Sequence, residues 1–176
     1  MEDAFGATAV GVASYAAATV AFLALTILLA VSWRGRAQGV RLIGASAMTA
    51  LWAALLTLQA WRDGFPAIVV YTLEVLRGGA WVFALLALAH GVLPRYLAIA
   101  AHTVWIALAI AGWVFAAHAG RLLAPAGIAL ALAVLVLIEQ IYRNANASGR
   151  EDFKFLAIGL GGVFAFDLFL FSQSEL

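Results

Sequence analysis

The chain has 176 residues, of which 66% are apolar and 11% are charged, with a mean hydropathy of +1.04 and a formal net charge of +1. Soluble domains are roughly 45–50% apolar and about 25% charged, so this composition excludes an ordinary soluble domain and indicates a membrane protein. The absence of cysteine excludes disulfides, thiolate metal sites and thiol catalysis. The sequence contains no run of basic residues that would indicate a nucleic-acid partner.

Six stretches are long and apolar enough to cross a membrane as helices. A hydrocarbon core about 30 Å thick requires ~20 helical residues. The predicted spans are 7–33, 40–61, 67–90, 95–118, 123–142 and 153–173. Because the breaks between them are short, we expect an all-α, polytopic transmembrane bundle that forms a single domain over residues 1–176.

The span boundaries carry helix-start signals. Pro66, Pro94 and Pro125 fall at the predicted starts of the third, fourth and fifth spans, where a missing N–H costs nothing. Ser148 and Glu151 have the spacing of a capping box that opens the sixth span. We therefore expect every proline to mark a start and none to kink a helix.

Basic residues are distributed unequally between the two ends of the predicted bundle. The short loops at one end hold Arg34, Arg36, Arg41, Arg95, Arg143, Arg150 and Lys154, and those at the other end hold Arg62 and Arg121. The positive-inside rule therefore predicts that the N-terminus faces outside. Six spans would return residue 176 to the outside as well, and the abrupt end FSQSEL favours a fragment of a longer chain.

Ionisable residues lie inside the predicted spans. They are Glu74, Arg77, His102, Glu139 and Asp167. An ionised residue near the bilayer centre costs roughly 2.5–3.5 kcal/mol on insertion scales, so such residues usually face protein or water. Glu74 and Asp167 lie at matching depths, each ~10 Å from the outer end of its span, and Arg77 is one turn deeper than Glu74 on the same helix face. We predict a buried charge cluster in which Arg77 pairs with Asp167 and Glu74 is the second carboxylate.

Two aromatic residues of the third span are expected to support this cluster. Trp81, four residues after Arg77, is expected to cover the guanidinium with its ring, and Tyr71 precedes Glu74 by one turn. Two interpretations of the cluster remain open. It either fixes helix packing, as interhelical polar contacts commonly do, or forms a ligand or proton site.

The other polar residues in the spans suggest structural roles. Glu139 lies near the inner end of the fifth span, and its carboxylate is expected to reach the headgroup region near Arg143. His102 is expected to contact a neighbouring helix. Without an HExxH motif or paired histidines, we expect no metal site.

Glycines suggest where helices approach closely. In the sixth span, Gly159, Gly161 and Gly162 are expected to let a neighbouring backbone come near. Prolines avoid the midplane, and only the Gly78–Gly79 pair could loosen a span. Carriers often bind substrate at broken helices near the midplane, so the scarcity of such breaks weighs against a carrier.

Residues 137–172, LIEQIYRNANASGREDFKFLAIGLGGVFAFDLFLFS, resemble the membrane region of PEP-CTERM system histidine kinases of the PrsK type. The shared features are an EQ-YRN segment, a basic KFL entry, a GLGG turn and an FAYDLYLYS-like close, and SWRGR and EVLRGGAW are weaker matches. The positions on the family pattern are Glu139, Gln140, Tyr142, Arg143, Asn144, Gly159, Gly161, Gly162 and Asp167. Phe166, Phe169 and Phe171 stand where the family usually has tyrosine.

The resemblance implies the N-terminal sensor region of a two-component histidine kinase in a bacterial inner membrane. In that family a cytoplasmic, ATP-binding kinase core follows the membrane region and acts with a response regulator on exopolysaccharide and exosortase-linked genes. It therefore implies a homodimer formed through the kinase and ATP bound only in that core. The lipid bilayer is the expected partner of this chain, which carries no catalytic residue of the family and no cofactor. The alternatives are a small multi-span transporter or permease-like subunit, and a structural membrane partner protein.

Overall fold

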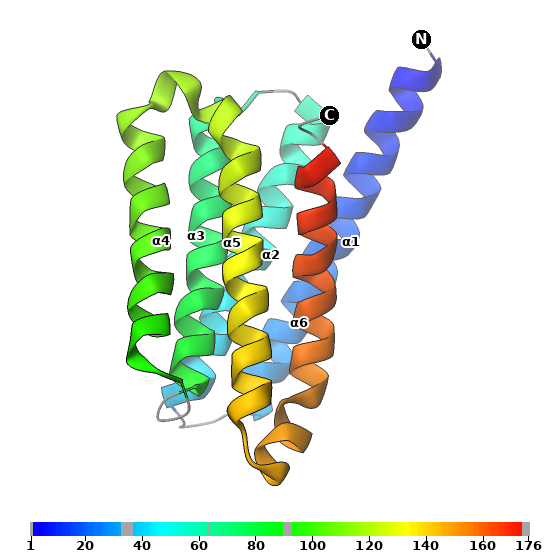
Figure 1. Ribbon diagram of the computed structural model, residues 1–176. Coiled ribbons are helices and arrows are strands. Elements are labelled where there is room, and N and C mark those ends of the chain that lie inside the picture. The colour runs from blue at the N-terminus through cyan, green and yellow to red at the C-terminus, as the bar shows by residue number, and fades with distance from the viewer. Residues whose placement is uncertain (1, 33–36, 63, 90–92, 174–176) are drawn as a thin grey trace.

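The computed structural model describes residues 2–32, 37–62, 64–89 and 93–173. Long α-helices make up most of these residues (Figure 1). They are α1 (Glu2–Ser32), α2 (Ala37–Arg62), α3 (Ala67–Leu88), α4 (Arg95–Val114), α5 (Ala119–Asn144) and α6 (Ala147–Gln173), with a short 3-10 helix η1 (Ala116–His118) before α5. Trp33, Arg34, Arg36 and His90 lie outside the described residues.

The helices confirm the predicted fold class. Each of α1 to α6 is long and apolar enough to cross a membrane, and the described parts of the chain contain no strand. The protein is therefore an all-α bundle of multi-pass membrane type. The side of the membrane on which the N-terminus lies remains a prediction.

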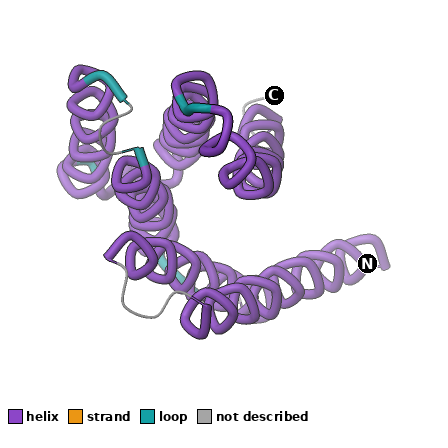
Figure 2. The backbone as a smooth tube through the Cα atoms, turned by 90° about the horizontal axis from the view of Figure 1, so that it is seen from below, coloured by secondary structure: helices purple, strands orange, loops and turns teal. Residues whose placement is uncertain are grey.

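Helix α3 is the centre of the bundle. It packs against α2, α4 and α5, and it is the most buried of the six helices. Helix α1 packs along α2, and α6 packs along α5. Seen along the bundle, α1 runs away from the other helices toward its N-terminus and leaves a wide separation from α6 (Figure 2).

Side-chain hydrogen bonds connect α3 to its neighbours. The Tyr71 hydroxyl donates to the Leu108 carbonyl of α4 at 2.7 Å, and the Trp105 indole of α4 donates to the Val75 carbonyl at 2.9 Å. The Trp81 indole donates to the Thr49 hydroxyl of α2 at 2.9 Å. Because lipid tails compete with apolar side chains for apolar partners, such polar contacts help to specify which helices meet in a membrane.

Close helix contacts occur at glycines of α3, α4 and α5. A Cβ added at Gly79 would overlap the Trp105 ring, one at Gly112 would overlap Tyr71, and one at Gly127 would overlap Phe171. The Gly78–Gly79 pair does not loosen its span, since α3 is continuous there and Gly78 packs against Leu130.

The glycines of α6 were also expected to contact a neighbouring backbone, and this expectation is wrong. In the part of the chain that the structure describes, no atom beyond the local backbone of α6 lies within 4 Å of a Cβ built at Gly159, Gly161 or Gly162. The reason is that α6 packs mainly along α5, through a face that includes Leu160 and Phe164. The face that carries Gly159 is left open.

The helix starts agree with only part of the boundary prediction. Pro66 and Pro94 are the N-cap residues of α3 and α4. Pro125, in contrast, lies inside α5, because residues 119–124 form additional helix before it; its missing N–H leaves the Arg121 carbonyl without the usual helical donor. Helix α6 begins at Ala147, and the Oδ1 of the preceding Asn146 accepts from the Gly149 N–H at 2.8 Å. Ser148 lies inside this helix, and its side chain is outside the described part of the chain.

Substituting Gly79 with alanine should destabilise the bundle by about 1–3 kcal/mol, the usual cost of overpacking. The reason is that the Trp105 ring which the new methyl group would meet is held by its hydrogen bond to Val75. Thermal unfolding of the purified chain in detergent measures the effect. Gly44→Ala is the matched control, because nothing lies within 4 Å of its Cβ; equal unfolding temperatures for the two variants would contradict this packing.

Candidate functional site

The structure brings Glu74, Arg77 and Asp167 together inside the helix bundle. Arg77 Nη2 donates to Glu74 Oε1 at 2.5 Å and to Asp167 Oδ2 at 2.7 Å. The side chains of Arg77, Glu74 and Asp167 are 2%, 4% and 11% exposed. The Arg77–Asp167 pairing, predicted from the matching depths of the residues in their spans, is therefore present. It joins α6 to α3 across 90 residues of sequence.

Aromatic rings of α2 and α6 cover the guanidinium. The Arg77 Cζ lies 4.2 Å from the centre of the Trp52 ring and 5.3 Å from that of Phe164. Such contacts contribute about 0.5–2 kcal/mol each, with the higher values where water is excluded. The desolvated Arg77 is therefore stabilised by two carboxylates and by two π faces.

The prediction that Trp81 and Tyr71 of α3 support the charge cluster is wrong. The Trp81 indole hydrogen bonds to Thr49 and its ring does not cover Arg77. Tyr71 lies on the α4 side of α3, where its hydroxyl bonds the Leu108 carbonyl. Both expectations considered only the helix that carries Arg77, whereas the covering rings come from its neighbours.

The contact of Trp52 with Arg77 could be predicted from the positions of the two residues along their helices. It lies ten positions before Arg62, the last residue of α2, and Arg77 lies ten positions after Ala67, the first residue of α3. Because a short connection makes these helices antiparallel neighbours, equal distance from the shared end places Trp52 and Arg77 at the same level.

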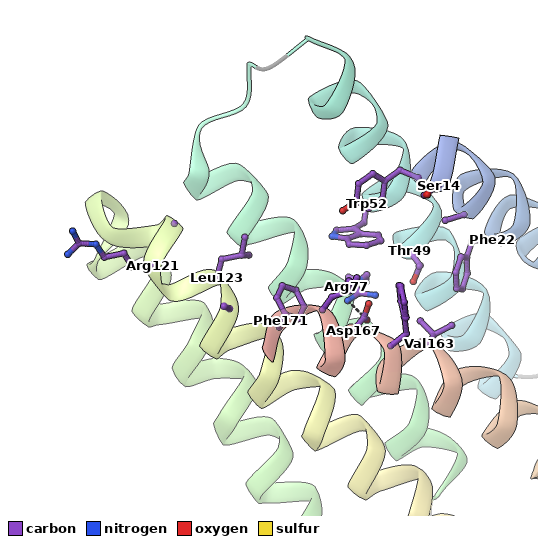
Figure 3. Close-up of a pocket in the computed structure, with 16 residues that line it drawn as sticks. Ser14, Phe22, Thr49, Trp52, Arg77, Arg121, Leu123, Val163, Asp167 and Phe171 are labelled. Atoms are coloured by element: carbon purple, nitrogen blue, oxygen red, sulfur yellow. Dashed lines mark hydrogen bonds and ion pairs between the residues drawn. The ribbon is translucent and has the colours of Figure 1, made fainter. Parts of the chain in front are cut away.

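A cavity of about 920 Å³ reaches the charge cluster. Its walls come from α1, α2, α3, α5 and α6, and Arg77 and Asp167 form part of its lining (Figure 3). Its further lining includes Ser14, Tyr15, Phe22, Thr49, Trp52, Val163 and Phe171. This volume falls in the range of roughly 300–1,000 Å³ typical of small-molecule sites.

The cavity has hydroxyl groups and aromatic rings around its charged centre. Tyr15 of α1 interacts electrostatically with all three cluster residues, and its ring meets Trp52 edge-on with centroids 5.9 Å apart. The hydroxyls of Ser14 and Thr49 already donate to backbone carbonyls of their own helices. Arg121 also lines the cavity, but its side chain points away from the cluster (Figure 3).

The family-pattern residues of α5 lie at the end of that helix, next to the α5–α6 turn and far along the bundle from the cluster. Arg150 of α6 donates to the carbonyls of Tyr142 and Arg143 at 3.1 and 2.9 Å, which satisfies the free end of α5. Asn144 donates to the Gln140 carbonyl at 2.8 Å. The positions named from the resemblance therefore lie at the end of α5, in the middle of α6 at glycines that point to different sides of the helix, and at Asp167 in the charge cluster.

The other sequence-predicted polar residues lie apart from the cluster. Glu139 pairs with Arg143 at 3.2 Å on the exposed surface, as a carboxylate reaching toward the headgroups would. His102 Nδ1 is 2.7 Å from the Ala98 carbonyl, and its ring meets Phe83 of α3. Within the described ranges, no three potential metal ligands gather.

Comparison of the chain with models of protein families, with curated proteins and with solved structures gives no match. The site presents a fixed guanidinium, two carboxylates and aromatic rings, which are groups that can recognise a polar molecule or hold a proton.

The Arg77–Asp167 pair should show strong energetic coupling. Arg77→Met leaves the buried carboxylates of Glu74 and Asp167 without their counter-ion, which costs about 3–5 kcal/mol, whereas Arg77 keeps Glu74 as a partner in Asp167→Leu. The double variant leaves Glu74 in place but removes the repulsion between the two carboxylates, so its cost should fall short of the sum of the single costs by about 2–3 kcal/mol, measured by reversible unfolding of the four proteins in mixed micelles.

The exposed Glu139–Arg143 pair supplies the matched control. Its two side chains are 59% and 68% exposed, so the corresponding cycle with Glu139→Leu and Arg143→Met should give less than about 1 kcal/mol. Additive effects of the Arg77 and Asp167 substitutions would contradict the buried pair.

Proposed function

We propose that this chain is the membrane-embedded sensor region of a two-component histidine kinase of the PrsK type, located in a bacterial inner membrane. The observation that carries this proposal is the cavity whose wall contains the Arg77–Asp167 contact between α3 and α6. The resemblance of residues 137–172 to that kinase family supports it, and so does a bundle of six helices able to span a membrane.

The proposed mechanism uses α6 as the element that moves. Helix α6 is much less buried than α3, and it is held by its packing on α5 and by the Asp167–Arg77 bond. An occupant of the cavity that binds better when this bond is altered shifts the bundle toward that arrangement, and only such differential binding transmits a signal. A tenfold preference is worth about 1.4 kcal/mol.

The partners of the proposed sensor follow from the family resemblance. The parent kinase core would bind ATP, form a homodimer and transfer phosphate to a response regulator that controls exopolysaccharide and exosortase-linked genes. The contribution of this chain is to anchor that core and to bias its activity.

The reading frame after codon 176 tests the proposal directly. We expect an ATP-binding kinase core in frame, because a sensor without an output domain transmits nothing. In membranes that contain the complete protein, Asp167→Asn should then change autophosphorylation from ATP severalfold, since it removes the charge that holds α6 to Arg77. Glu139→Gln, which alters an exposed carboxylate, should leave the rate unchanged.

Two outcomes contradict the kinase proposal. One is a stop codon at position 177, and the other is autophosphorylation that responds equally to both substitutions. The first outcome favours the alternatives of a carrier or a structural partner protein.

The carrier alternative is favoured by one observation, a buried cluster of two carboxylates and one guanidinium, of which Asp167 and Arg77 line a cavity. A proton or cation carrier needs such a site. Ion or proton flux into proteoliposomes that falls in both Glu74→Gln and Asp167→Asn would support this alternative, and flux that neither substitution changes would exclude it.

A further inference from the structure

A second cavity continues the first along α1 and α6. It has a volume of about 450 Å³, and Phe22 of α1 and Val163 of α6 line both cavities. The other residues that line it are Leu25, Trp81, Phe155, Leu156, Gly159 and Leu160. The two cavities therefore adjoin each other, and together they are here called the α1–α6 groove.

The two ends of this groove differ in chemistry. The first cavity contains Arg77, Asp167 and hydroxyl-bearing side chains, whereas the lining of the second consists of apolar and aromatic residues with one glycine. Phe155 and Gly159 belong to the first half of α6, and Asp167 belongs to its second half. A molecule that fills the groove must therefore have a polar head at the end where α6 finishes and an apolar tail pointing toward the start of α6.

The groove opens toward the surroundings of the bundle. Phe166 of α6, which lines the first cavity, is 60% exposed, and Phe155, which lines the second, is 79% exposed. Both views of the backbone show α1 diverging from α6 toward the N-terminus (Figures 1 and 2). For helices that span a membrane, this side faces lipid, so an occupant can enter from the bilayer.

The charge cluster restricts the head of the occupant. Arg77 forms part of the lining of the first cavity, so the head of the occupant meets a hydrogen-bond donor there and an oxygen acceptor suits it. An anionic head is disfavoured, because the Asp167 carboxylate lines the first cavity and the Arg77 guanidinium is already paired with two carboxylates. The Asp167 carboxylate favours a head that donates a hydrogen bond to it, as a hydroxyl does.

We propose that the α1–α6 groove binds an uncharged lipid, with its hydroxyl or carbonyl head at Arg77 and Asp167 and its apolar chain along Gly159 and Val163. Gly159 keeps this path open, since nothing lies within 4 Å of a Cβ built there. The inference deepens the proposed sensor function by naming the class of its ligand, but binding by this chain does not depend on a kinase core.

Gly159→Leu tests the inference, because leucine fills the groove without meeting a neighbouring atom at its Cβ. Gly161→Leu is the matched control: its Cβ position is equally free, it is about 200° further around α6, and it does not line the groove. Native mass spectrometry of the delipidated full chain, titrated with decylubiquinone or with 1,2-dioctanoylglycerol, measures binding. Sodium decanoate supplies an anionic head on a chain of similar length.

We expect saturable binding of at least one uncharged probe to the unsubstituted chain and to Gly161→Leu, weakened at least tenfold in Gly159→Leu. The probe that binds at the lower concentration distinguishes a quinone-type carbonyl head from a glycerol-type hydroxyl head. Decanoate should bind at least tenfold more weakly than that probe.

Three results would overturn the inference: no binding of either uncharged probe, equal binding by the two glycine variants, or decanoate binding as tightly as the uncharged probes. A dimer that Gly159→Leu dissociates while probe binding is unchanged would identify the groove as an interface between two copies. The sensor proposal is tested separately, because it depends on the downstream reading frame and on phosphorylation.

Discussion

A guanidinium placed in the middle of a membrane helix must be neutralised within the protein, and this requirement organises the bundle. Arg77 lies halfway along α3, and only 2% of its side chain is exposed. The structure satisfies it with Glu74 from the same helix, Asp167 from α6, and the rings of Trp52 and Phe164. Leaving any of these charges unpaired costs free energy, so the pairing fixes the position of α6 along α3. This matters because α6 is much less buried than α2, α3 and α5.

Polar contacts also connect the rest of α3 to its neighbouring helices. Tyr71 and Trp105 fix α4, Trp81 fixes α2, and glycines let the aromatic rings approach the helix backbones. Helix α1 has fewer such contacts with the bundle; Ser46 of α2 donates to its Phe22 carbonyl at 3.3 Å. Polar contacts are thus concentrated on one side, and on the other side α1 and α6 border an open groove. The proposed binding function follows from this asymmetry, because the groove ends at the charges that hold α6 in place.

The fold class and the charge pairing could be predicted from the sequence, because both depend on position along a span. Hydropathy defines six helices, and equal depth brings Glu74, Arg77 and Asp167 to one level. Which ring covers Arg77 depends instead on the lateral arrangement of helices, which hydropathy does not contain. For this reason Trp81 was expected and Trp52 is found. The glycines of α6 were misjudged for the same reason: small residues permit close contact, but only the positions of the neighbouring helices decide whether they make one.

The distance between the Arg77 guanidinium and the Asp167 carboxylate in a bilayer tests the account most directly. Solid-state NMR of a chain with ¹⁵N-labelled arginine and ¹³C-labelled aspartate side chains measures it through their dipolar coupling. The account predicts a short-range coupling, corresponding to the 2.7 Å separation of Nη2 and Oδ2, that disappears in Asp167→Asn. A spectrum without such a coupling, or with one that Asp167→Asn leaves unchanged, would contradict the pairing and with it the proposed link between the groove and α6.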